Sequence, residues 1–500
     1  MTDQAASYRR ILKSSSIIGG ASVANILISL GRTKVLAILL GPAGIGLVSL
    51  YRALQTTGAT VATFGLDIVG TRQIAEADAE RNDHALAVAR RAIFFSTVAL
   101  AGLGGLLMWV FRGFIAQRVL GNAADSNIVG WLALGVVLSV GAASLAALIQ
   151  GMRHIGDIAR VTIYGALANT IFGILLIWRW GAHAIVFYVL INPIANFLFG
   201  SWYVARLPRP PARTIPLREM TAQWKMLVVV GLPFMGGAVA TALIQLWIRV
   251  DVARVLGAHA LGQFQASWTI TTQYITLALG AMAADYYPRL TGVVKDRVAA
   301  TRLVNEQTEI ALLLSGPIFL AMMGLAPWVL RLLYTAQFAP AVVVLRWQVL
   351  SDVLKVASWP LGFILLAAGD GKAFFWTETA SLLVLAGTIS ALLRPFGLEI
   401  TGAAFLVCYV FYLPVVYWLA RIRIGFAWSG HVARLLTATF VVTAGVGVLA
   451  SESRWGGALA GCLASAVFGT YALGRLSHMS GLGGTAGKLG AMARRLTTRN

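Results

Sequence analysis

The chain has 500 residues, of which 58% are hydrophobic and only 12% are charged, and its mean hydropathy is +0.78. A soluble domain usually has about 25% charged residues, so this composition excludes a soluble class and predicts an integral membrane protein. Lys and Arg number 40 against 19 Asp and Glu, a net charge of +21. Most of these cations lie in short segments between apolar runs, where they orient a membrane protein, so we expect no nucleic-acid partner. No soluble stretch is long enough to fold alone, and we do not expect an enzyme.

Apolar runs of about 20 residues can each cross a bilayer as one helix. The first six such runs lie near residues 15–40, 45–69, 92–111, 127–150, 158–178 and 182–205. After a segment rich in Pro and Arg, six more lie near 226–255, 260–286, 308–332, 341–367, 373–393 and 400–420, and two further runs lie near 432–450 and 455–474. We therefore expect an all-α membrane protein with about 14 transmembrane helices.

These spans suggest a domain organisation. We expect an N-terminal lobe at 1–205, a cytoplasmic basic linker at 206–225, a C-terminal lobe at 226–420, two extra helices at 431–475 and a basic cytoplasmic tail at 476–500. An even number of spans puts both termini on one side of the membrane. The loops on that side carry most of the Lys and Arg residues, which predicts that both termini are cytoplasmic.

A short repeat relates the two lobes. The segment RTKVLAILLGPAGIG, which begins at Arg32, resembles RVDVARVLGAHALG, which begins at Arg249. Gly41 and Gly46 of the first segment match Gly257 and Gly262 of the second, at an offset of about 216 residues. Since six spans return the chain to its starting side, the repeat is parallel. It predicts two six-helix lobes related by a pseudo-twofold axis along the membrane normal, with a substrate between them.

The block TKVLAILLGPAGIGLVSLY, from Thr33 to Tyr51, resembles the multidrug/oligosaccharidyl-lipid/polysaccharide exporter superfamily, as do the lobe repeat and the span number. Within that superfamily the chain is most similar to the polysaccharide transporters that flip O-antigen-type units. The resemblance implies a flippase that moves an undecaprenyl-pyrophosphate-linked oligosaccharide from the cytoplasmic to the outer leaflet by alternating access. It also implies a bacterial inner-membrane location and a role in O-antigen, capsule or exopolysaccharide assembly, with membrane lipids and glycan polymerase or other assembly proteins as partners. A lipid II flippase and a cation-coupled multidrug exporter of the same superfamily are the alternatives.

Three arginines lie inside predicted spans at a similar depth. Arg32 precedes Gly41, Arg249 precedes Gly257 and Arg52 follows Gly46, each by six to nine residues, which is roughly 9 to 14 Å along a helix. A charge at the centre of a membrane helix costs about 2.5 to 3.5 kcal/mol and needs compensation. Since Arg can hold phosphate oxygens with paired N–H groups, we expect these residues to bind an anionic head group. Snorkelling toward the outer head groups is the alternative, and for Arg52 it is equally favoured.

The remaining charged residues of the spans have less specific interpretations. Lys34 and Asp251 occupy equivalent repeat positions and are candidates for a gate, unless each pairs with a neighbour such as Arg254. The other charged residues have two interpretations. They couple transport to a proton or Na⁺, or they form structural ion pairs such as Asp67 with Arg72 or Asp285 with Arg289. The candidates for ion coupling or the cavity are Asp67, Asp285, Arg346, Asp352, Lys355 and Glu378.

Aromatic residues and the last two spans complete the candidate site. Trp247, Trp268 and Trp347 lie deep enough to stack on sugar rings, although ordinary packing is the default. The two extra spans form either a groove for the isoprenoid tail or a lipid-facing support. Neither the scattered histidines nor Cys408 and Cys462 have the spacing of a metal site, and we expect no metal and no cofactor.

Overall fold

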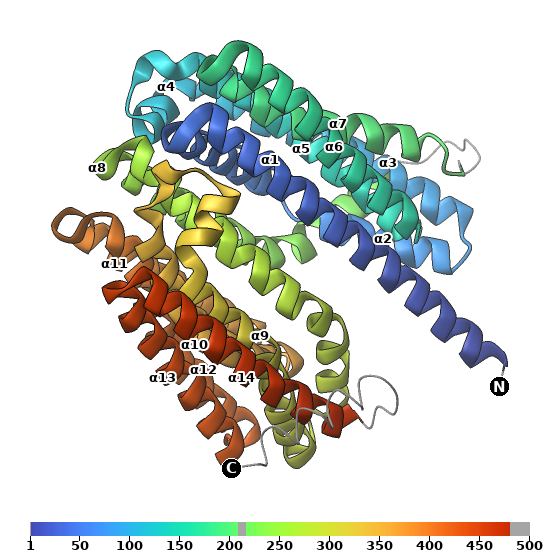
Figure 1. Cartoon of the computed structure of the whole chain (residues 1–500). Coiled ribbons are helices and arrows are strands. Elements are labelled where there is room, and N and C mark those ends of the chain that lie inside the picture. Colours follow the sequence, from blue (N-terminus) through green and yellow to red (C-terminus); the bar gives the residue numbers. More distant parts are fainter. Residues whose placement is uncertain (1, 209–216, 481–500) are drawn as a thin grey trace. The chain divides into compact units, whose positions relative to one another are not determined.

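The computed structural model describes residues 2–208 and 217–480, which form helices joined by short turns and contain no strand (Figure 1). Residues 209–216 of the expected linker and the expected tail beyond residue 480 lie outside this description. The first half of the chain contains α1 (Thr2–Thr63), α2 (Leu66–Ala79), α3 (Asp83–Val110), α4 (Arg112–Ile115), η1 (Ala116–Leu120), η2 (Ala123–Asp125), α5 (Ser126–Gly151), α6 (Ile155–Trp180), η3 (Gly181–Ala184) and α7 (Ile185–Val204). The second half contains α8 (Leu217–Val293), α9 (Arg297–Leu333), η4 (Ala336–Phe338), α10 (Ala341–Ala367), α11 (Gly371–Phe396), η5 (Gly397–Glu399), α12 (Ile400–Ile424), α13 (Gly430–Glu452) and α14 (Arg454–Ser480).

Several helices begin where a short polar side chain replaces a missing backbone partner. The side chain of Asn82 accepts a hydrogen bond from Ala85 N at the start of α3. Asp296, Asp370 and Ser429 cap α9, α11 and α13 in the same way. Such caps satisfy backbone N–H groups that have no partner within the first turn, so these residues end the loops and start the spans.

Nine helical stretches among the described residues are long and apolar enough to cross a membrane. Two of them, 155–204 and 371–424, each contain two helices joined by a short 3-10 turn. The predicted all-α, multi-pass membrane fold is therefore confirmed. The number of fourteen spans stays a prediction.

The two longest helices, α1 and α8, are each divided by a glycine. Gly41 in α1 has φ 63° and ψ −172°, and Gly257 in α8 has φ 86° and ψ 169°. An L-residue with a side chain rarely adopts this conformation, so glycine is required where each helix turns. The two glycines are 216 residues apart in the sequence, which is the offset of the predicted repeat.

The contacts divide the chain into two compact units, residues 1–262 and 263–500. In the first unit, α1 packs against α3, α5 and α6, and α5 packs against α7. In the second unit, α10 packs against α9 and α12, and α14 packs against α9. The boundary at Gly262 lies inside α8, so the first half of this helix belongs to the first unit. The expected division lies before α8, in the linker at 206–225. The expected lobe boundaries themselves stay a prediction.

The glycines that follow the two turns make a reciprocal contact within the first unit. A Cβ atom at Gly46 would lie 2.1 Å from the Ala258 carbonyl oxygen, and a Cβ at Gly262 would lie 1.8 Å from the Pro42 carbonyl oxygen. Adding the offset of 216 to 46 and subtracting it from 258 converts the first contact into the second, which is the reciprocal pattern that a twofold axis produces. Only glycine fits at either position, because no side-chain atom can approach a backbone oxygen so closely.

In the second unit, α14 is attached to α9 along a seam of small residues. A Cβ at Gly324 would lie 2.4 Å from the Gly457 carbonyl oxygen, and a Cβ at Gly461 would lie 2.8 Å from the Leu320 carbonyl oxygen. Small residues allow membrane helices to pack with their backbones close together. At the far end of the seam, Glu309 pairs with Arg475 Nε at 2.7 Å and His431 Nε2 at 3.2 Å. Close packing and the ion pair of Arg475 with Glu309 therefore hold α14 on α9.

Candidate functional site

The structure brings two of the three predicted head-group residues together. Arg32 is half-buried on α1, and its charge interacts with that of Arg52 and with Tyr188 of α7. Residues 32 and 52 would be about 30 Å apart on one straight helix. Their interaction therefore depends on the turn at Gly41, which folds the second half of α1 back along the first. Arg52 itself is exposed.

The third arginine is placed differently. Arg249 of α8 lies in the same unit and is only 7% exposed, and its Nη1 donates a hydrogen bond to the Gln245 carbonyl oxygen at 2.9 Å. Part of its guanidinium is thus satisfied by its own helix. The binding of an anionic head group by these arginines stays a prediction.

The charged residues of the predicted gate, Lys34 and Asp251, lie on α1 and α8, the two helices that also carry the three arginines. Arg254 donates a hydrogen bond to the Arg118 carbonyl oxygen of η1, which ties α8 to the loop after α4. Among the described residues, the buried Oδ2 atom of Asp251 accepts no hydrogen bond. Lys34 is half-buried. A gate formed by Lys34 and Asp251 stays a prediction.

Two of the candidate carboxylates are exposed. Asp285 pairs with Arg289 at 3.1 Å, one turn along α8, as the ion-pair interpretation expects. Arg72 instead pairs with Glu76 at 2.7 Å, and not with Asp67. Ion coupling through Asp67 or Asp285 stays a prediction.

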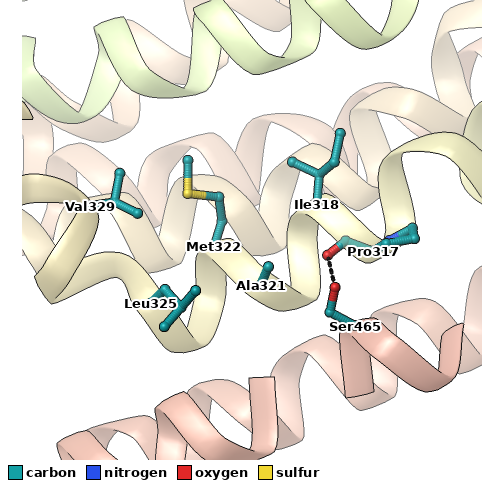
Figure 2. Close-up of a pocket in the computed structure, with 7 residues that line it drawn as sticks. All are labelled: Pro317, Ile318, Ala321, Met322, Leu325, Val329 and Ser465. Atoms are coloured by element: carbon teal, nitrogen blue, oxygen red, sulfur yellow. Dashed lines mark hydrogen bonds between the residues drawn. The ribbon is translucent and has the colours of Figure 1, made fainter. Parts of the chain in front are cut away.

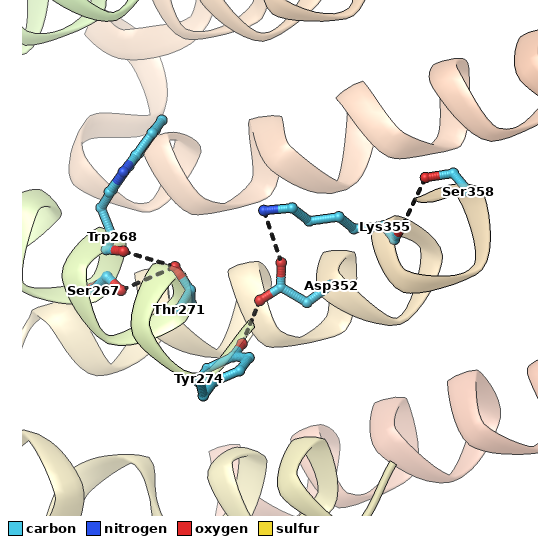
Figure 3. A network of polar contacts seen from close by, with 7 residues as sticks. All are labelled: Ser267, Trp268, Thr271, Tyr274, Asp352, Lys355 and Ser358. Carbon is cyan, nitrogen blue, oxygen red and sulfur yellow. Dashed lines mark hydrogen bonds and ion pairs between the residues drawn. The ribbon is translucent and has the colours of Figure 1, made fainter. Parts of the chain in front are cut away.

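A buried polar network occupies the interior of the second unit (Figure 3). Asp352 of α10 is 3% exposed, and the hydroxyl of Tyr274 on α8 donates a hydrogen bond to its Oδ2 atom. Lys355 Nζ lies 4.0 Å from Asp352 Oδ1, as Figure 3 shows, and 5.8 Å from the centre of the Tyr409 ring of α12. Residues from three helices, α8, α10 and α12, thus surround the pair of Asp352 and Lys355.

Glu378 of α11 extends this network. It accepts a hydrogen bond from the Tyr412 hydroxyl, and the charge of Lys355 acts on it. Lys355 therefore interacts with two carboxylates, Asp352 and Glu378. Arg346 is oriented elsewhere, and its charge interacts with that of Arg454 at the start of α14.

The three tryptophans proposed for sugar stacking differ in their surroundings. Trp268 packs edge-on against Phe264 and Phe405, at centroid distances of 5.5 and 5.0 Å. Trp347 donates its indole N–H to Glu399 Oε1 at 2.8 Å. Trp247 is 46% exposed and is the most exposed of the three. Stacking on sugar stays a prediction for all three.

An apolar groove runs along the seam between α9 and α14 (Figure 2). Its volume is about 350 Å³, and an adjoining groove of about 580 Å³ shares Leu325 with it. Ser465 donates a hydrogen bond to the Pro317 carbonyl oxygen at 2.8 Å and closes one end (Figure 2). The first groove is lined by Pro317, Ile318, Ala321, Met322, Leu325, Val329 and Ser465.

Residues 35–343, which include most of the first repeat segment, the whole of the second and all of α9, match the family of polysaccharide biosynthesis proteins. The chain belongs to this polysaccharide biosynthesis protein family. It is also similar to the lipid III flippase of Escherichia coli (strain K12), with 21% identity over 397 residues, which cover 76% of this chain and 91% of that protein. The lipid III flippase of Shigella flexneri matches to the same extent.

Solved structures show that this polysaccharide biosynthesis protein has a known transporter fold. An inward-facing multidrug resistance MATE family transporter of the MOP superfamily matches with a TM-score of 0.68 and 17% identity, over 80% of this chain and 94% of that one. The lipid II flippase MurJ in an inward closed conformation matches with a TM-score of 0.67 and 12% identity, over 92% and 98%. The family match thus confirms the predicted polysaccharide family, and the chain has the fold of these transporters.

The tyrosines of the buried network were not identified from the sequence of this polysaccharide biosynthesis protein. Tyr274 and Tyr412 each lie in an apolar span and donate to a carboxylate on another helix. A buried tyrosine hydroxyl usually has a hydrogen-bond partner, so a tyrosine deep within a predicted span was the available signal. The signal does not identify the partner helix.

Proposed function

We propose that this protein is a flippase that moves an undecaprenyl-pyrophosphate-linked oligosaccharide from the cytoplasmic to the outer leaflet of the bacterial inner membrane. It acts by alternating access, without covalent chemistry, in the assembly of a surface polysaccharide such as O-antigen, capsule or exopolysaccharide. Both termini are cytoplasmic. The family, the two lipid III flippases among its relatives and the transporter fold support this proposal.

One observation carries the choice of substrate class. Arg32 and Arg52 bring two like charges together from two neighbouring predicted membrane spans, where they repel each other. A ligand with two or more negative charges would remove this repulsion and accept paired N–H donors from each guanidinium. A lipid pyrophosphate has this chemistry. The same site would disfavour the cationic substrates of many drug exporters.

The groove on α9 suits the other end of the substrate. Its lining is apolar along its length, apart from the Ser465 hydroxyl, which is already bonded. A polyprenyl tail fits such a surface, whereas a sugar chain would leave its hydroxyls without partners. The extra helices then guide the tail while the head group crosses. A lipid II flippase would use the same features, and it is the second candidate because its fold also matches.

The proposal predicts that Arg32→Ala and Arg249→Ala each lower the leaflet-to-leaflet transfer of a labelled polyprenyl-pyrophosphate oligosaccharide in proteoliposomes. A hydrogen bond to a charged group contributes about 1.5 to 3 kcal/mol, so the loss should be roughly 10- to 100-fold. Arg32→Lys keeps the charge but loses the paired N–H donors of the guanidinium, and it should give an intermediate rate.

Arg179→Ala is the matched control, because Arg179 is exposed at the end of α6. It should transfer the lipid at the rate of the wild type. Equal rates for the wild type and all four variants would show that Arg32 and Arg249 snorkel to the head-group region. A wild type that is inactive on every such lipid would move the assignment toward drug export.

A further inference from the structure

The network around Lys355 has an unbalanced charge. Asp352 and Glu378 contribute two negative charges, and Lys355 contributes one positive charge, so with all three ionised the net charge is −1. Asp352 is 3% exposed and lies in the interior of the second unit. Burying an uncompensated charge in a membrane protein is costly, so the group is expected to take up one cation.

The chemistry of the site favours a proton over a metal ion. Tyr274 donates to one Asp352 oxygen and Tyr412 to one Glu378 oxygen, so half of the carboxylate oxygens already accept hydrogen bonds. The ammonium of Lys355 lies 4.0 Å from the other oxygen of Asp352 and would repel a metal cation there. A proton needs only one lone pair, and no shell of oxygen ligands.

Two further side chains of α10 point to water beside the network. Gln348 is 1% exposed and Ser351 is fully buried, yet among the described residues neither amide atom of Gln348 nor the hydroxyl of Ser351 has a hydrogen-bond partner. They lie one turn before Asp352 and Lys355 respectively, and so share their helix face. Buried polar groups without protein partners usually bind ordered water, which can also conduct a proton.

We propose that Asp352 and Glu378 share one proton through a site centred on Lys355, and that this proton is the ion that drives the flippase. The second part rests on the proposed function, whereas the first does not. The proton belongs to the pair, since the two carboxylates interact through the same ammonium. The titratable groups that face the site are Tyr274 from α8, Asp352 and Lys355 from α10, Glu378 from α11, and Cys408, Tyr409 and Tyr412 from α12.

A proline in α10 can couple protonation of this site to a change in the bend of the helix. Pro360 lies inside α10, five residues after Lys355, and removes one backbone hydrogen bond there. The Tyr286 hydroxyl donates to the Pro360 carbonyl oxygen at 2.9 Å and holds this part of the helix in place. Protonation weakens the attraction between Lys355 and the carboxylates, and α10 can then change its bend at the proline.

Infrared difference titration of the purified full chain tests the proton site without any transport. The wild type should show the C=O stretching band of one protonated carboxyl near neutral pH, shifted in D₂O. Asp352→Asn leaves Lys355 and Glu378 as a neutral pair, so the band should be lost. Adding Lys355→Met to Asp352→Asn restores the charge of −1, and one band should return. Asp285→Asn, at an exposed carboxylate, should leave the band unchanged.

Gradient experiments in proteoliposomes test the coupling. Wild-type transfer of the lipid-linked oligosaccharide should accelerate at least several-fold with an imposed pH gradient and not with a Na⁺ gradient, and Asp352→Asn should lose this response. Absence of the band in the wild type, or its persistence in Asp352→Asn, overturns the site. A response to Na⁺ alone overturns its role in coupling. A band in a wild type that transfers no such lipid contradicts the proposed function and leaves the proton site standing.

Discussion

Gly262→Ala should abolish most lipid transfer while the protein remains folded in the membrane. The added Cβ would lie 1.8 Å from the Pro42 carbonyl oxygen, and a backbone atom cannot rotate away as a side chain can. The two glycine turns must therefore separate. Overpacking of this kind costs about 1 to 3 kcal/mol, which lowers the population of the state with touching turns by roughly 5- to 150-fold. An exporter that alternates between two states loses its rate when one of them becomes rare.

The chain offers two internal comparisons for this prediction. Gly46→Ala should have a similar effect, because its Cβ would lie 2.1 Å from the Ala258 carbonyl oxygen. The double variant should be little worse than either single one, since both changes break the same contact. Gly31→Ala on α1 is the control: its Cβ would meet no atom within 4 Å, and Ala favours the helix.

Transfer rates and elution on size-exclusion chromatography would separate loss of function from loss of folding. Full transfer by Gly262→Ala would show that the turns need not meet during the cycle. Aggregation of Gly31→Ala together with Gly262→Ala would indicate a general intolerance of these helices to alanine.

The glycine turns illustrate what the sequence could predict. Gly41 and Gly257 were matched by spacing alone, and both adopt the left-handed conformation that glycine permits. Gly46 and Gly262 were matched in the same way, and both lie where a side chain would collide with backbone. At such positions the residue type itself reports the geometry, so a repeat of residues predicts a repeat of structure. Long apolar runs predicted the all-α membrane fold for a similar reason.

Contacts between helices far apart in the sequence could not be predicted. Tyr274 and Asp352 are 78 positions apart, and helical periodicity gives the face of each residue but not the neighbouring helix. Carboxylates on the same helix also compete for one arginine, and Arg72 pairs with Glu76 and not with Asp67. The alignment of Arg32 with Arg249 indicated related positions, yet Arg32 is half-buried near Arg52 while Arg249 is buried and bonded to its own helix.

Ala321→Trp should lower the transfer of substrates with a long prenyl tail about tenfold and leave a short-tailed analogue unaffected. Ala321 lines the groove between α9 and α14, and an indole there would fill much of its volume of about 350 Å³ (Figure 2). Lipid tails are as apolar as the groove, so a tail gains packing contacts there and no hydrophobic free energy. About ten lost atom contacts of 0.1 to 0.2 kcal/mol each amount to roughly 1.5 kcal/mol, or one order of magnitude in affinity.

The tail-length comparison separates the two roles proposed for the extra helices. A groove that holds the tail predicts a loss for the long-tailed substrate alone. A lipid-facing support predicts equal rates for both substrates, or an equal loss with a lower melting temperature if the indole disturbs the seam at Gly324 and Gly461. Ala438→Trp, at an exposed position of α13, adds the same indole away from the groove. It should transfer both substrates at the wild-type rate, because a tryptophan on the lipid side displaces only lipid.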